Sequence, residues 1–445
     1  VNSKHSLALW SIIQHGFSPK QRRGVGAGAT ASATSRMRPS SHESKGETLD
    51  VPAAERWNPP PQDGRLSDNV TLTRTVSGRC LYVVSSQIGG SMPFLKDRLG
   101  HVCKPAAQAE KEFYEELPNV YPFLVPFTPK YYGCCTVNIN SALQDISTHF
   151  KSATGGYVPR VYADGSASQS MPLQVKERWD LFQSRRHKKV SRDADGNVEF
   201  IMLEDVTRNH QFSNVVDIKL GSEQYAHQQD PRKIEGLDPV KRQKIERATL
   251  KCRNSTSAEY GFRINGMQIY REDKEIYKVT DKYNCRNLDI SGTDRALERF
   301  LKYPTWDNLA QIRRLIEDLQ QLAAALRKTS WRYYGLSLLL SYDPSQVTPQ
   351  NRNEATVDIR LIDFAKCERR SPTDEDSDDE SEYHVSVVQG IENLSKVLEG
   401  IEQRHKRRRA ELESRRKRHR QILRMSSLSA MFGAAAFMLF AGRRR

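Results

Sequence analysis

The chain has 445 residues, a hydrophobic content of 37% and a formal net charge of +15 at pH 7. Its length allows one large domain or two lobes with polar ends. The first 42 residues carry a net charge of +6 and the last 47 carry +10, so the middle is nearly neutral and the basic pI says little about a ligand. The seven Cys form no CxxC pair, which argues against a zinc ribbon or disulfide scaffold and favours a reducing compartment.

The N-terminal part of the chain changes from a low-complexity stretch to short predicted elements. Residues 24–66 are rich in Gly, Ala, Ser and Pro, and we expect residues 1–68 to form a disordered leader. Folded structure is expected to begin near residue 69. Short strands are predicted at 80–86 and 101–105, a helix at 108–117 and a buried strand at 199–206.

A second unit is expected to begin with a strand at 213–221. Residues 260–270 alternate like a hairpin, with Asn265-Gly266 as turn residues. Apolar residues at helical spacing predict a helix at 306–326, followed by strands at 331–343 and 355–365 and a closing helix at 391–401. Strands first, then mixed strands and helices, favour an α+β protein with an N-lobe at 69–210, a C-lobe at 211–401 and a basic tail at 402–445.

Three short features follow an order that suits a nucleotide site. Lys104 stands on a predicted strand with Glu110 at the start of the next helix, and a lysine braced by a carboxylate can bridge nucleotide phosphates. Asp217 and Lys219 are two residues apart on a strand, so they face the same side and suit a ribose hydroxyl and a phosphate. Asp363 ends a strand, where a carboxylate can hold magnesium on nucleotide phosphates. Each feature alone is also common in proteins without such a site.

A fourth feature is the basic segment 232–253, which carries a net charge of +5 inside a nearly neutral region. Its cations are Arg232, Lys233, Lys241, Arg242, Lys244, Arg247, Lys251 and Arg253. Lys241, Lys244 and Lys251 can share a helix face, because their spacings fit the helical repeat. A small polyanion needs such a cluster, since each phosphate carries about −1.5 to −2 charges near neutral pH. A solvated helix is the alternative, and the position just after 213–221 favours a ligand.

Together these residues resemble the inositol polyphosphate kinase family. The family signature PxxxDxKxG is similar to residues 213–221, where Ser213 stands in place of the proline. Segments 103–118, 126–133, 251–270 and 390–398 are similar to the inositol hexakisphosphate kinase branch, notably in the elements STSA at 255–258 and GMQ at 266–268. Two departures are Cys285, where glycine is expected, and Gly335-Leu336 before Ser337, where the family shows a serine-rich run.

The resemblance implies a two-lobed kinase-like fold of the inositol polyphosphate kinase type, with an ATP-binding N-lobe and a C-lobe that binds substrate and metal. It implies ATP and Mg²⁺ as cofactors and transfer of the γ-phosphoryl group to a ring phosphate of inositol hexakisphosphate, at the 5-position. It also implies the site residues. They are Lys219 and Asp217 for catalysis; Lys104, Glu110, Glu204, Val206, Asp217 and Ser337 for the nucleotide, with Glu204 and Val206 as the adenine hinge; Lys219, Lys241, Arg242, Lys244, Arg247 and Lys251 for the substrate; and Asp363 for the metal.

Two other functions stay open at this point. A multikinase that phosphorylates free inositol hydroxyls shares the DIKLG and IDF segments, and a non-catalytic polyphosphate-binding scaffold would need the same cations. The STSA and GMQ elements favour the hexakisphosphate kinase.

The basic tail raises separate expectations about location and partners. It has no interleaved aromatic residues, so we expect no specific nucleic-acid partner. Its apolar stretch 428–441 is fourteen residues long, or eighteen with 425–427 and 442, whereas a spanning helix needs about 20. The basic flanks of this stretch suggest a short tail anchor and contact with a membrane. We otherwise expect a monomer in the cytoplasm, the nucleus or both.

Overall fold

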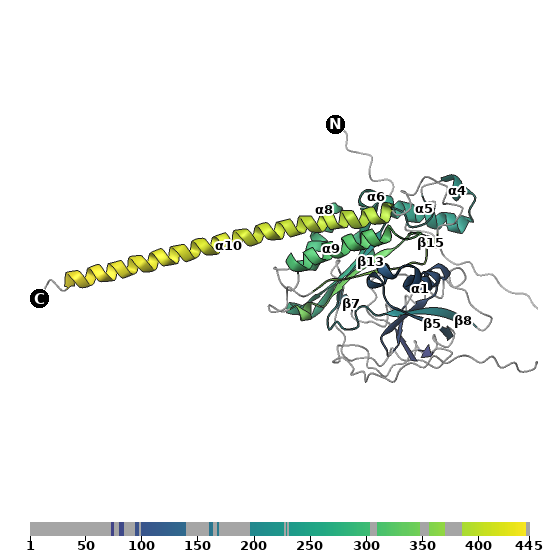
Figure 1. The fold of residues 1–445 in the computed structure, drawn as a ribbon, viewed down its shortest axis with the longest axis horizontal. Coiled ribbons are helices and arrows are strands. Elements are labelled where there is room, and N and C mark those ends of the chain that lie inside the picture. Colours follow the sequence, from purple (N-terminus) through teal and green to yellow (C-terminus); the bar gives the residue numbers. More distant parts are fainter. Residues whose placement is uncertain are drawn as a thin grey trace, which may run out of the picture. The chain divides into compact units, whose positions relative to one another are not determined.

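The computed structural model describes residues 73–74, 80–83, 94–97, 99–138, 160–162, 167–168, 196–226, 228, 231–302, 309–347, 356–369 and 385–441. The expected leader at 1–68 lies outside these residues. The described part combines two main sheets with helices, and the expected α+β class is confirmed (Figure 1).

The first sheet has six strands in the order β1-β2-β3-β4-β8-β5, and all neighbours are antiparallel. The strands are β1 (Thr73–Arg74), β2 (Cys80–Val83), β3 (Leu95–Asp97), β4 (His101–Pro105), β5 (Tyr131–Asn138) and β8 (Asn197–Glu204). Helix α1 (Gln108–Val120) follows β4 and leads into the 3₁₀ helix η1 (Pro122–Phe127). Residues Phe113, Tyr114 and Leu117 of α1 recur at helical spacing and are buried, which gives this helix one core-facing side.

The second sheet has seven strands in the order β14-β13-β9-β10-β11-β6-β7. They are β6 (Arg160–Tyr162), β7 (Ala167–Ser168), β9 (Asn214–Leu220), β10 (Phe262–Arg271), β11 (Ile276–Thr280), β13 (Ser337–Tyr342) and β14 (Asp358–Ile362), and only the β11–β6 pair is parallel among these described strands. Strands β6 and β7 come from the stretch expected to form the N-lobe, so the two sheets do not divide at one point of the chain. The lobe boundaries stay a prediction.

The expected hairpin at residues 260–270 is wrong, because β10 runs straight through Asn265 and Gly266. Both edges of this strand are occupied: β9 pairs with its first part and β11 with its second. Those ladder hydrogen bonds outweigh the local turn preference of an Asn-Gly pair. The pair instead forms an irregularity, where the register against β9 shifts between Ile264 and Gly266.

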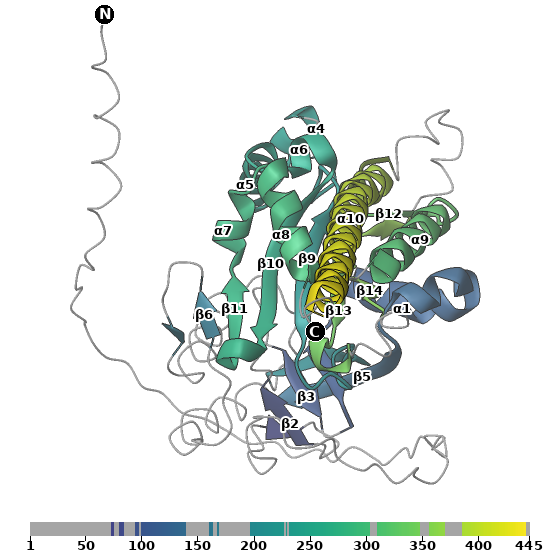
Figure 2. The ribbon, with the colours of Figure 1, turned by 90° about the vertical axis from the view of Figure 1, so that its left-hand side faces the viewer.

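Helices cover the second sheet on one side. They are α4 (Pro231–Glu235), α5 (Pro239–Arg253), α6 (Ser257–Tyr260), α7 (Lys282–Arg286), α8 (Ile290–Lys302), α9 (Leu309–Leu326) and α10 (Val385–Ala441). Smaller elements are η2 (Glu272–Lys274), η3 (Pro344–Gln346) and a two-stranded sheet of β12 (Trp331–Arg332) and β15 (Glu368–Arg369). Figure 2 shows α8, α10 and α9 lying across β10, β9 and β13. Helix α9 confirms the helix expected from periodicity, from Leu309 onward.

Aromatic packing joins α1 to the end of β14. The rings of Phe113 and Phe364 are stacked with centroids 3.8 Å apart, and Trp331 meets Phe113 edge-on at 5.5 Å. All three side chains are almost fully buried. Each such aromatic pair contributes about 0.5–1.5 kcal/mol beyond the area that it buries. Because Phe364 directly follows Asp363, this packing also fixes the distance between α1 and the carboxylate of Asp363.

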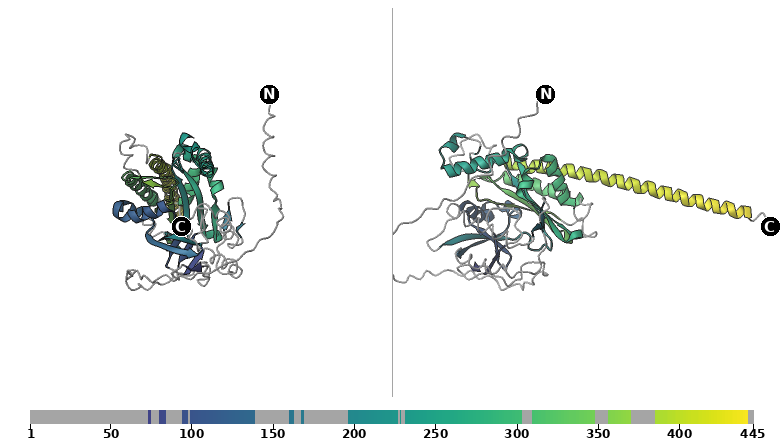
Figure 3. Two further views of the ribbon diagram at one scale, coloured as in Figure 1. Left: turned by 90° about the vertical axis from the view of Figure 1, so that its right-hand side faces the viewer. Right: turned by 180° about the vertical axis from the view of Figure 1, so that it is seen from behind.

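Helix α10 is 57 residues long, and its two halves have different surroundings. Up to His405 it packs against α9 and α8, where Glu402 pairs with Arg313 at 2.6 Å and Arg404 pairs with Glu298 at 3.2 Å. Every side chain from Arg407 to Phe432 is exposed, although Arg408 still reaches Glu298 of α8 at 3.5 Å. Figure 3 shows the far part of α10 lying apart from the other elements. The expected closing helix and most of the expected tail are therefore one helix. None of the described helices is long and apolar enough to span a bilayer.

Gly390 lets α10 approach the turn before β10, and we expect Gly390→Ala to destabilise the fold. A Cβ at residue 390 would lie 2.1 Å from the backbone oxygen of Gly261. Since that neighbour is backbone, the helix must shift, and overpacking of this kind costs about 1–3 kcal/mol. Urea unfolding followed by circular dichroism would measure the loss.

Gly400→Ala is the matched control on the same helix. A Cβ there meets nothing closer than the Arg404 guanidinium at 3.7 Å. It should therefore raise the free energy of unfolding by about 0.5–1 kcal/mol through helix propensity. Equal effects of the two substitutions would contradict a tight crossing at Gly390.

Candidate functional site

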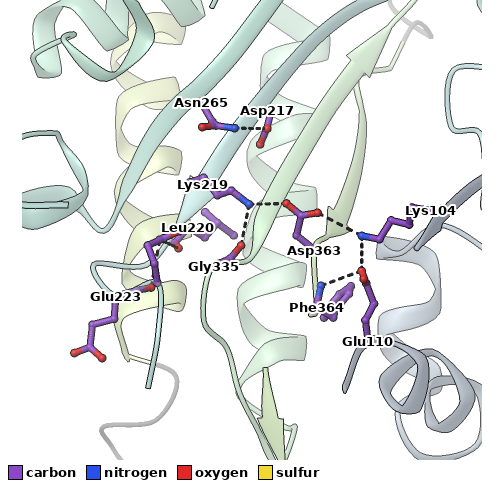
Figure 4. A network of polar contacts seen from close by, with 11 residues as sticks. Lys104, Glu110, Asp217, Lys219, Leu220, Glu223, Asn265, Gly335, Asp363 and Phe364 are labelled. Atoms are coloured by element: carbon purple, nitrogen blue, oxygen red, sulfur yellow. Dashed lines mark hydrogen bonds and ion pairs between the residues drawn. The ribbon is translucent and has the colours of Figure 1, made fainter. Parts of the chain in front are cut away.

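Lys104 and Glu110 form the pair expected from the sequence. The Nζ of Lys104 lies 2.7 Å from Oε1 of Glu110 and 3.4 Å from Oδ1 of Asp363 (Figure 4). Strand β4 ends just before α1 begins, so the strand lysine and the first turn of the helix meet. Burial alone would lower the pKa of Lys104, but the carboxylates of Glu110 and Asp363 raise it above its ordinary value. The ammonium therefore stays charged between two carboxylates.

Glu110 ties the helix to the segment that follows β14. Its side chain is 1% exposed, and burial raises its pKa despite the nearby ammonium of Lys104. The backbone N–H of Phe364 donates a hydrogen bond of 3.2 Å to Oε1 of Glu110. One carboxylate thus contacts both the strand lysine and the residue next to Asp363, which holds these groups in a fixed relation.

Asp363 follows β14 in a left-handed conformation, with φ of 73°. Aspartate tolerates this region better than most residues, and such outliers gather at functional sites. Its Oδ2 accepts a hydrogen bond of 2.6 Å from Nζ of Lys219. Burial would raise the pKa of Asp363, but Lys219 and Lys104 together hold it well below its usual range. The carboxylate is therefore ionised and lies between two ammonium groups.

Lys219 and Asp217 project from the same face of β9, as their spacing predicts. Besides Asp363, Lys219 donates a 2.9 Å hydrogen bond to the backbone oxygen of Gly335. Asp217 is buried and accepts a 2.7 Å hydrogen bond from Nδ2 of Asn265. Burial raises the pKa of Asp217 even though Lys219 lies nearby. Figure 4 shows the Asp217–Asn265 pair next to the Lys219–Asp363–Lys104 chain but not joined to it.

A row of three residues crosses the second sheet at Lys219. Ser337 of β13 and Arg263 of β10 are its direct partners on the two neighbouring strands. Side chains at directly paired positions point to the same face, and like charges placed opposite each other are destabilising. The pairing brings Arg263 next to Lys219, although their head groups bond to different partners, Lys219 to Asp363 and Arg263 to Ser257. Ser337 is fully buried, and its hydroxyl helps to limit the rise in the pKa of Asp217.

Five cations from three elements gather beside this row, and we call them the basic cluster. They are Arg247 and Lys251 of α5, Arg263 of β10, and Lys282 and Arg286 of α7. Partial burial, with the charges of the other four, lowers the pKa of Lys251. Burial likewise lowers the pKa of Arg263, which is 6% exposed and donates a 2.7 Å hydrogen bond to Ser257.

The basic cluster lacks compensating acids at ion-pair distance. Within the described part of the chain, none of its five side chains has a carboxylate partner within 4.0 Å. Five neighbouring positive charges of this kind fit a ligand that carries several negative charges.

The structure separates the predicted substrate residues of α5. Arg247 and Lys251 reach the basic cluster, and Lys244 lies one turn earlier on the same helix face. Arg242 lies on the opposite face, where its guanidinium donates to the backbone oxygen of Glu235 at the end of α4. It is therefore not brought to the cluster, because nine residues along a helix turn the side chain by about 180° relative to Lys251.

Three members of the basic cluster were missed by sequence reasoning: Arg263, Lys282 and Arg286. Their neighbours in sequence are not basic, so no local charge run marks them. Only the pairing of β10 with β9 places Arg263 opposite Lys219. Lys241, also predicted to bind substrate, lies in the first turn of α5, where Asp238 accepts a hydrogen bond from its backbone N–H.

The expected adenine hinge lies at the end of β8. The carboxylate of Glu204 accepts a 3.2 Å hydrogen bond from the Lys130 N–H, and the Glu204 N–H donates to the Lys130 oxygen at 2.8 Å. Asp205, which the sequence reasoning missed, pairs with Lys96 of β3 and steadies the next turn. Nothing among the described residues accepts a hydrogen bond from the Val206 N–H. A flat ligand with a hydrogen-bond acceptor could use that group.

Comparison with known proteins finds similar sequences among inositol phosphate kinases. Residues 200–399 match the family model for inositol polyphosphate kinase. The chain is 27% identical to inositol hexakisphosphate kinase 3 of Mus musculus over 386 residues, which covers 71% of this chain and 94% of that protein. It is 26% identical to inositol hexakisphosphate kinase 1 of Homo sapiens over 428 residues, which covers 70% and 91% respectively.

The match to the inositol polyphosphate kinase model is confined to residues 200–399. The matched range holds Asp217, Lys219, Asp363 and all of the basic cluster, whereas Lys104 and Glu110 precede it. A solved structure, the inositol phosphate multikinase of S. cerevisiae in complex with ADP and Mn²⁺, is 19% identical with a TM-score of 0.44, covering 67% of this chain and 98% of that one.

The site offers one carboxylate that suits magnesium next to two cations that suit phosphates. Within the described residues no group of three or more His, Cys, Asp or Glu could hold a metal by itself. Magnesium, however, is often bound through one or two carboxylates, with waters and substrate phosphates as its other ligands. Asp363 fits that arrangement, because Lys104 and Lys219 lie on either side of it. These two lysines would hold the phosphates of the nucleotide.

The pH dependence of stability should reveal the ion pairs of Asp363. Because its pKa is lowered by folding, its ionised form stabilises the fold above the ordinary pKa of about 3.9, and this contribution is lost as the pH falls through the lower folded-state value. The wild-type protein should be more stable than Asp363→Asn near neutral pH. The difference should shrink below about pH 4, as measured by urea unfolding.

Asp273→Asn serves as the control for this experiment. Asp273 pairs with Arg271 at the surface, where an ion pair contributes little because solvent screens it. A pH dependence as large for Asp273→Asn as for Asp363→Asn would contradict a special role of the Lys104–Asp363–Lys219 network.

Proposed function

We propose that this protein is an ATP-dependent inositol hexakisphosphate kinase that forms a diphosphoinositol pentakisphosphate. The observation that carries the proposal is the position of Lys219. Its Nζ lies 2.6 Å from Asp363, and its direct partner across the strands is Arg263 of the basic cluster. One ammonium thus stands between a nucleotide side and a polyanion side. Relatives named inositol hexakisphosphate kinases, 26–27% identical over most of the chain, support this choice.

The basic cluster supports a highly phosphorylated acceptor. Each phosphate group carries about −1.5 to −2 charges near neutral pH, so a hexakisphosphate can contact several cations at once. The five cations of the cluster have no carboxylate partners among the described residues. An acceptor with few phosphates would leave part of their mutual repulsion in place, so the cluster favours the more highly charged substrate.

The other side of Lys219 supports ATP as the donor. The turn at Glu204 and Val206 offers backbone groups for adenine, and Asp217 is placed for a ribose hydroxyl. Lys104 would bind the phosphates, and Asp363 would hold magnesium. When bound, magnesium neutralises charge on the phosphates and positions the phosphoryl group for transfer.

The proposed reaction is an in-line transfer that needs no general base. The acceptor oxygen belongs to a phosphate, which is already ionised at neutral pH. Asp363 is a poor base in any case, because two lysines hold its pKa below the usual range. Hydrogen bonds to Gly335 and Asp363 hold the Lys219 ammonium in place, so its position is preorganised before the reactants bind. We infer that catalysis rests on positioning and on charge neutralisation by Lys219 and Lys104.

A multikinase that phosphorylates free hydroxyl groups is the second candidate. Such a reaction benefits from a group that takes the hydroxyl proton in the transition state. Asp217 is a carboxyl with a raised pKa on the same strand as Lys219, although burial and its bond to Asn265 hold it in the sheet. The scaffold alternative would leave the ordered Lys104–Asp363–Lys219 chain without a use. The monomeric state and the cytoplasmic or nuclear location stay predictions.

Purified full-length protein with magnesium and ATP should convert inositol hexakisphosphate into a diphosphoinositol product. Inositol trisphosphate should react much more slowly. Lys219→Ala should lower the turnover number by at least about 100-fold, since it removes a preorganised charge at the transferred group. Products are resolved by charge.

Lys111→Ala is the control for general effects of removing a lysine, because Lys111 pairs with Glu199 on the outer side of α1. Turnover of the trisphosphate alone would favour the multikinase. Turnover of neither substrate, with intact folding, would favour the scaffold. Full activity of Lys219→Ala would refute its proposed role.

Lys251→Gln should weaken binding of inositol hexakisphosphate, which a higher Michaelis constant would report. Because Lys251 belongs to the basic cluster, loss of its charge should raise the KM by about three- to thirtyfold and reduce the salt dependence of binding. The KM for ATP should change little. Initial rates at several salt concentrations test this.

Arg253→Gln is the control, because it removes the same charge from the same helix. Arg253 is an exposed residue of α5 outside the cluster. Its KM should stay near the wild-type value. Similar changes in both variants would mean that the net charge of α5, and not the cluster, governs substrate binding.

A further inference from the structure

The exposed half of α10 carries a dense positive charge that lies outside the proposed site. Residues 406–424, which we call the basic shaft, contain ten Lys or Arg and two Glu. From Arg407 onward all of their side chains are exposed. The four consecutive cations at 415–418 project at steps of about 100°, so positive charge surrounds the helix on every side.

The next part of α10, residues 425–441, is apolar, and we call it the apolar tip. It contains no charged residue, and its first half exposes large side chains. Met425, Leu428, Met431 and Phe432 are 69%, 53%, 70% and 73% exposed. Exposed apolar side chains that are contiguous along a helix mark an interaction surface. Residues 443–445 are all Arg, so the tip lies between two basic segments.

The charge pattern argues against a second copy of α10 as the partner. A coiled coil needs apolar residues at two positions of every seven, facing the other helix. The basic shaft has apolar residues only at Ala410, Leu412, Ile422 and Leu423, which do not repeat in that way. Two parallel shafts would also bring like charges together along their whole length.

A lipid surface with anionic headgroups fits both parts of the helix at once. Lys and Arg near such a surface are attracted to it, and apolar side chains gain by entering the acyl boundary. The 17 residues of the tip reach roughly 26 Å at 1.5 Å per residue, whereas the hydrocarbon core is about 30 Å thick. The tip thus has the length to enter a bilayer from one side, with the shaft at the headgroups.

We propose that the exposed half of α10 docks the protein on an anionic lipid surface, with the apolar tip inserted and the basic shaft bound to the headgroups. The two parts contribute different forces. Attraction of the shaft depends on the lipid charge and is screened by salt, whereas insertion of the tip depends on its apolar side chains and not on salt.

Vesicle flotation of the full-length protein tests this docking. Phosphatidylcholine vesicles are compared with vesicles that contain about one-third phosphatidylserine. Binding should be at least about tenfold tighter to the anionic vesicles and should weaken as salt is added. Phe432→Asp should weaken this binding by at least about tenfold, because it places a charge in the tip.

Leu412→Asp is the matched control, since it makes the same charge change at an exposed apolar residue of the shaft, 52% exposed. It should weaken binding by less than about threefold. Kinase activity on soluble substrate should be unchanged in both variants, because neither residue lies at the site. Equal losses in the two variants would overturn insertion of the tip.

Two other results would overturn the proposal as a whole. The first is equal binding to both kinds of vesicle, or to neither. The second is a dimer in sedimentation velocity that Phe432→Asp converts into a monomer without any lipid present, because the tip would then bind a second copy of the chain. Binding to RNA without binding to anionic vesicles would likewise assign the shaft to a nucleic acid.

Discussion

The carboxylate of Asp363 must stay between two ammonium groups that come from different sheets. Lys104 belongs to the first sheet and Lys219 to the second, and both lie within 3.4 Å of Asp363. A left-handed backbone turns the carboxylate toward them, and the stacked rings of Phe364 and Phe113 hold that backbone against α1. The nucleotide side of the site therefore depends on packing between α1 and the end of β14 as much as on the charged residues themselves.

Charge is arranged differently on the two sides of Lys219. Toward the nucleotide side, cations and carboxylates alternate from Lys219 through Asp363 and Lys104 to Glu110, so the network is largely balanced without a ligand. Toward the basic cluster, positive charges stand together. Like charges held close together repel one another, so this side gains the most when a polyanion binds. The contrast explains how a nearly neutral core can hold a strongly basic site.

Two features of helix α10 do not depend on the charges of the site, and they have different physical causes. The Gly390–Gly261 crossing lets α10 approach β10. The position of α10 therefore depends on the absence of side chains at these two glycines. Beyond Arg408, which still contacts Glu298 of α8 at 3.5 Å, the side chains of the same helix face solvent. One continuous helix therefore stabilises the folded domain with its first half and presents a separate surface with its second.

Local sequence was sufficient where neighbouring residues decide the outcome. The spacing of Asp217 and Lys219 placed both on one face of a strand, the apolar period of 306–326 gave a helix, and the short link from Lys104 to Glu110 brought that pair together. Local sequence was misleading at Asn265-Gly266, because pairing on both edges of β10 overrides a turn preference. It also grouped Arg242 with Lys251, although the helix turns them to opposite faces.

By itself, then, the sequence determined the α+β class, the residues that flank the nucleotide side and the family that they resemble, since all of these follow from short-range spacing. Only the tertiary structure decided which cations share a site. Arg263, Lys282 and Arg286 join Lys251 through strand pairing and helix packing between segments far apart in the chain. Electrostatic interaction depends on distance in space, and sequence separation does not measure that distance.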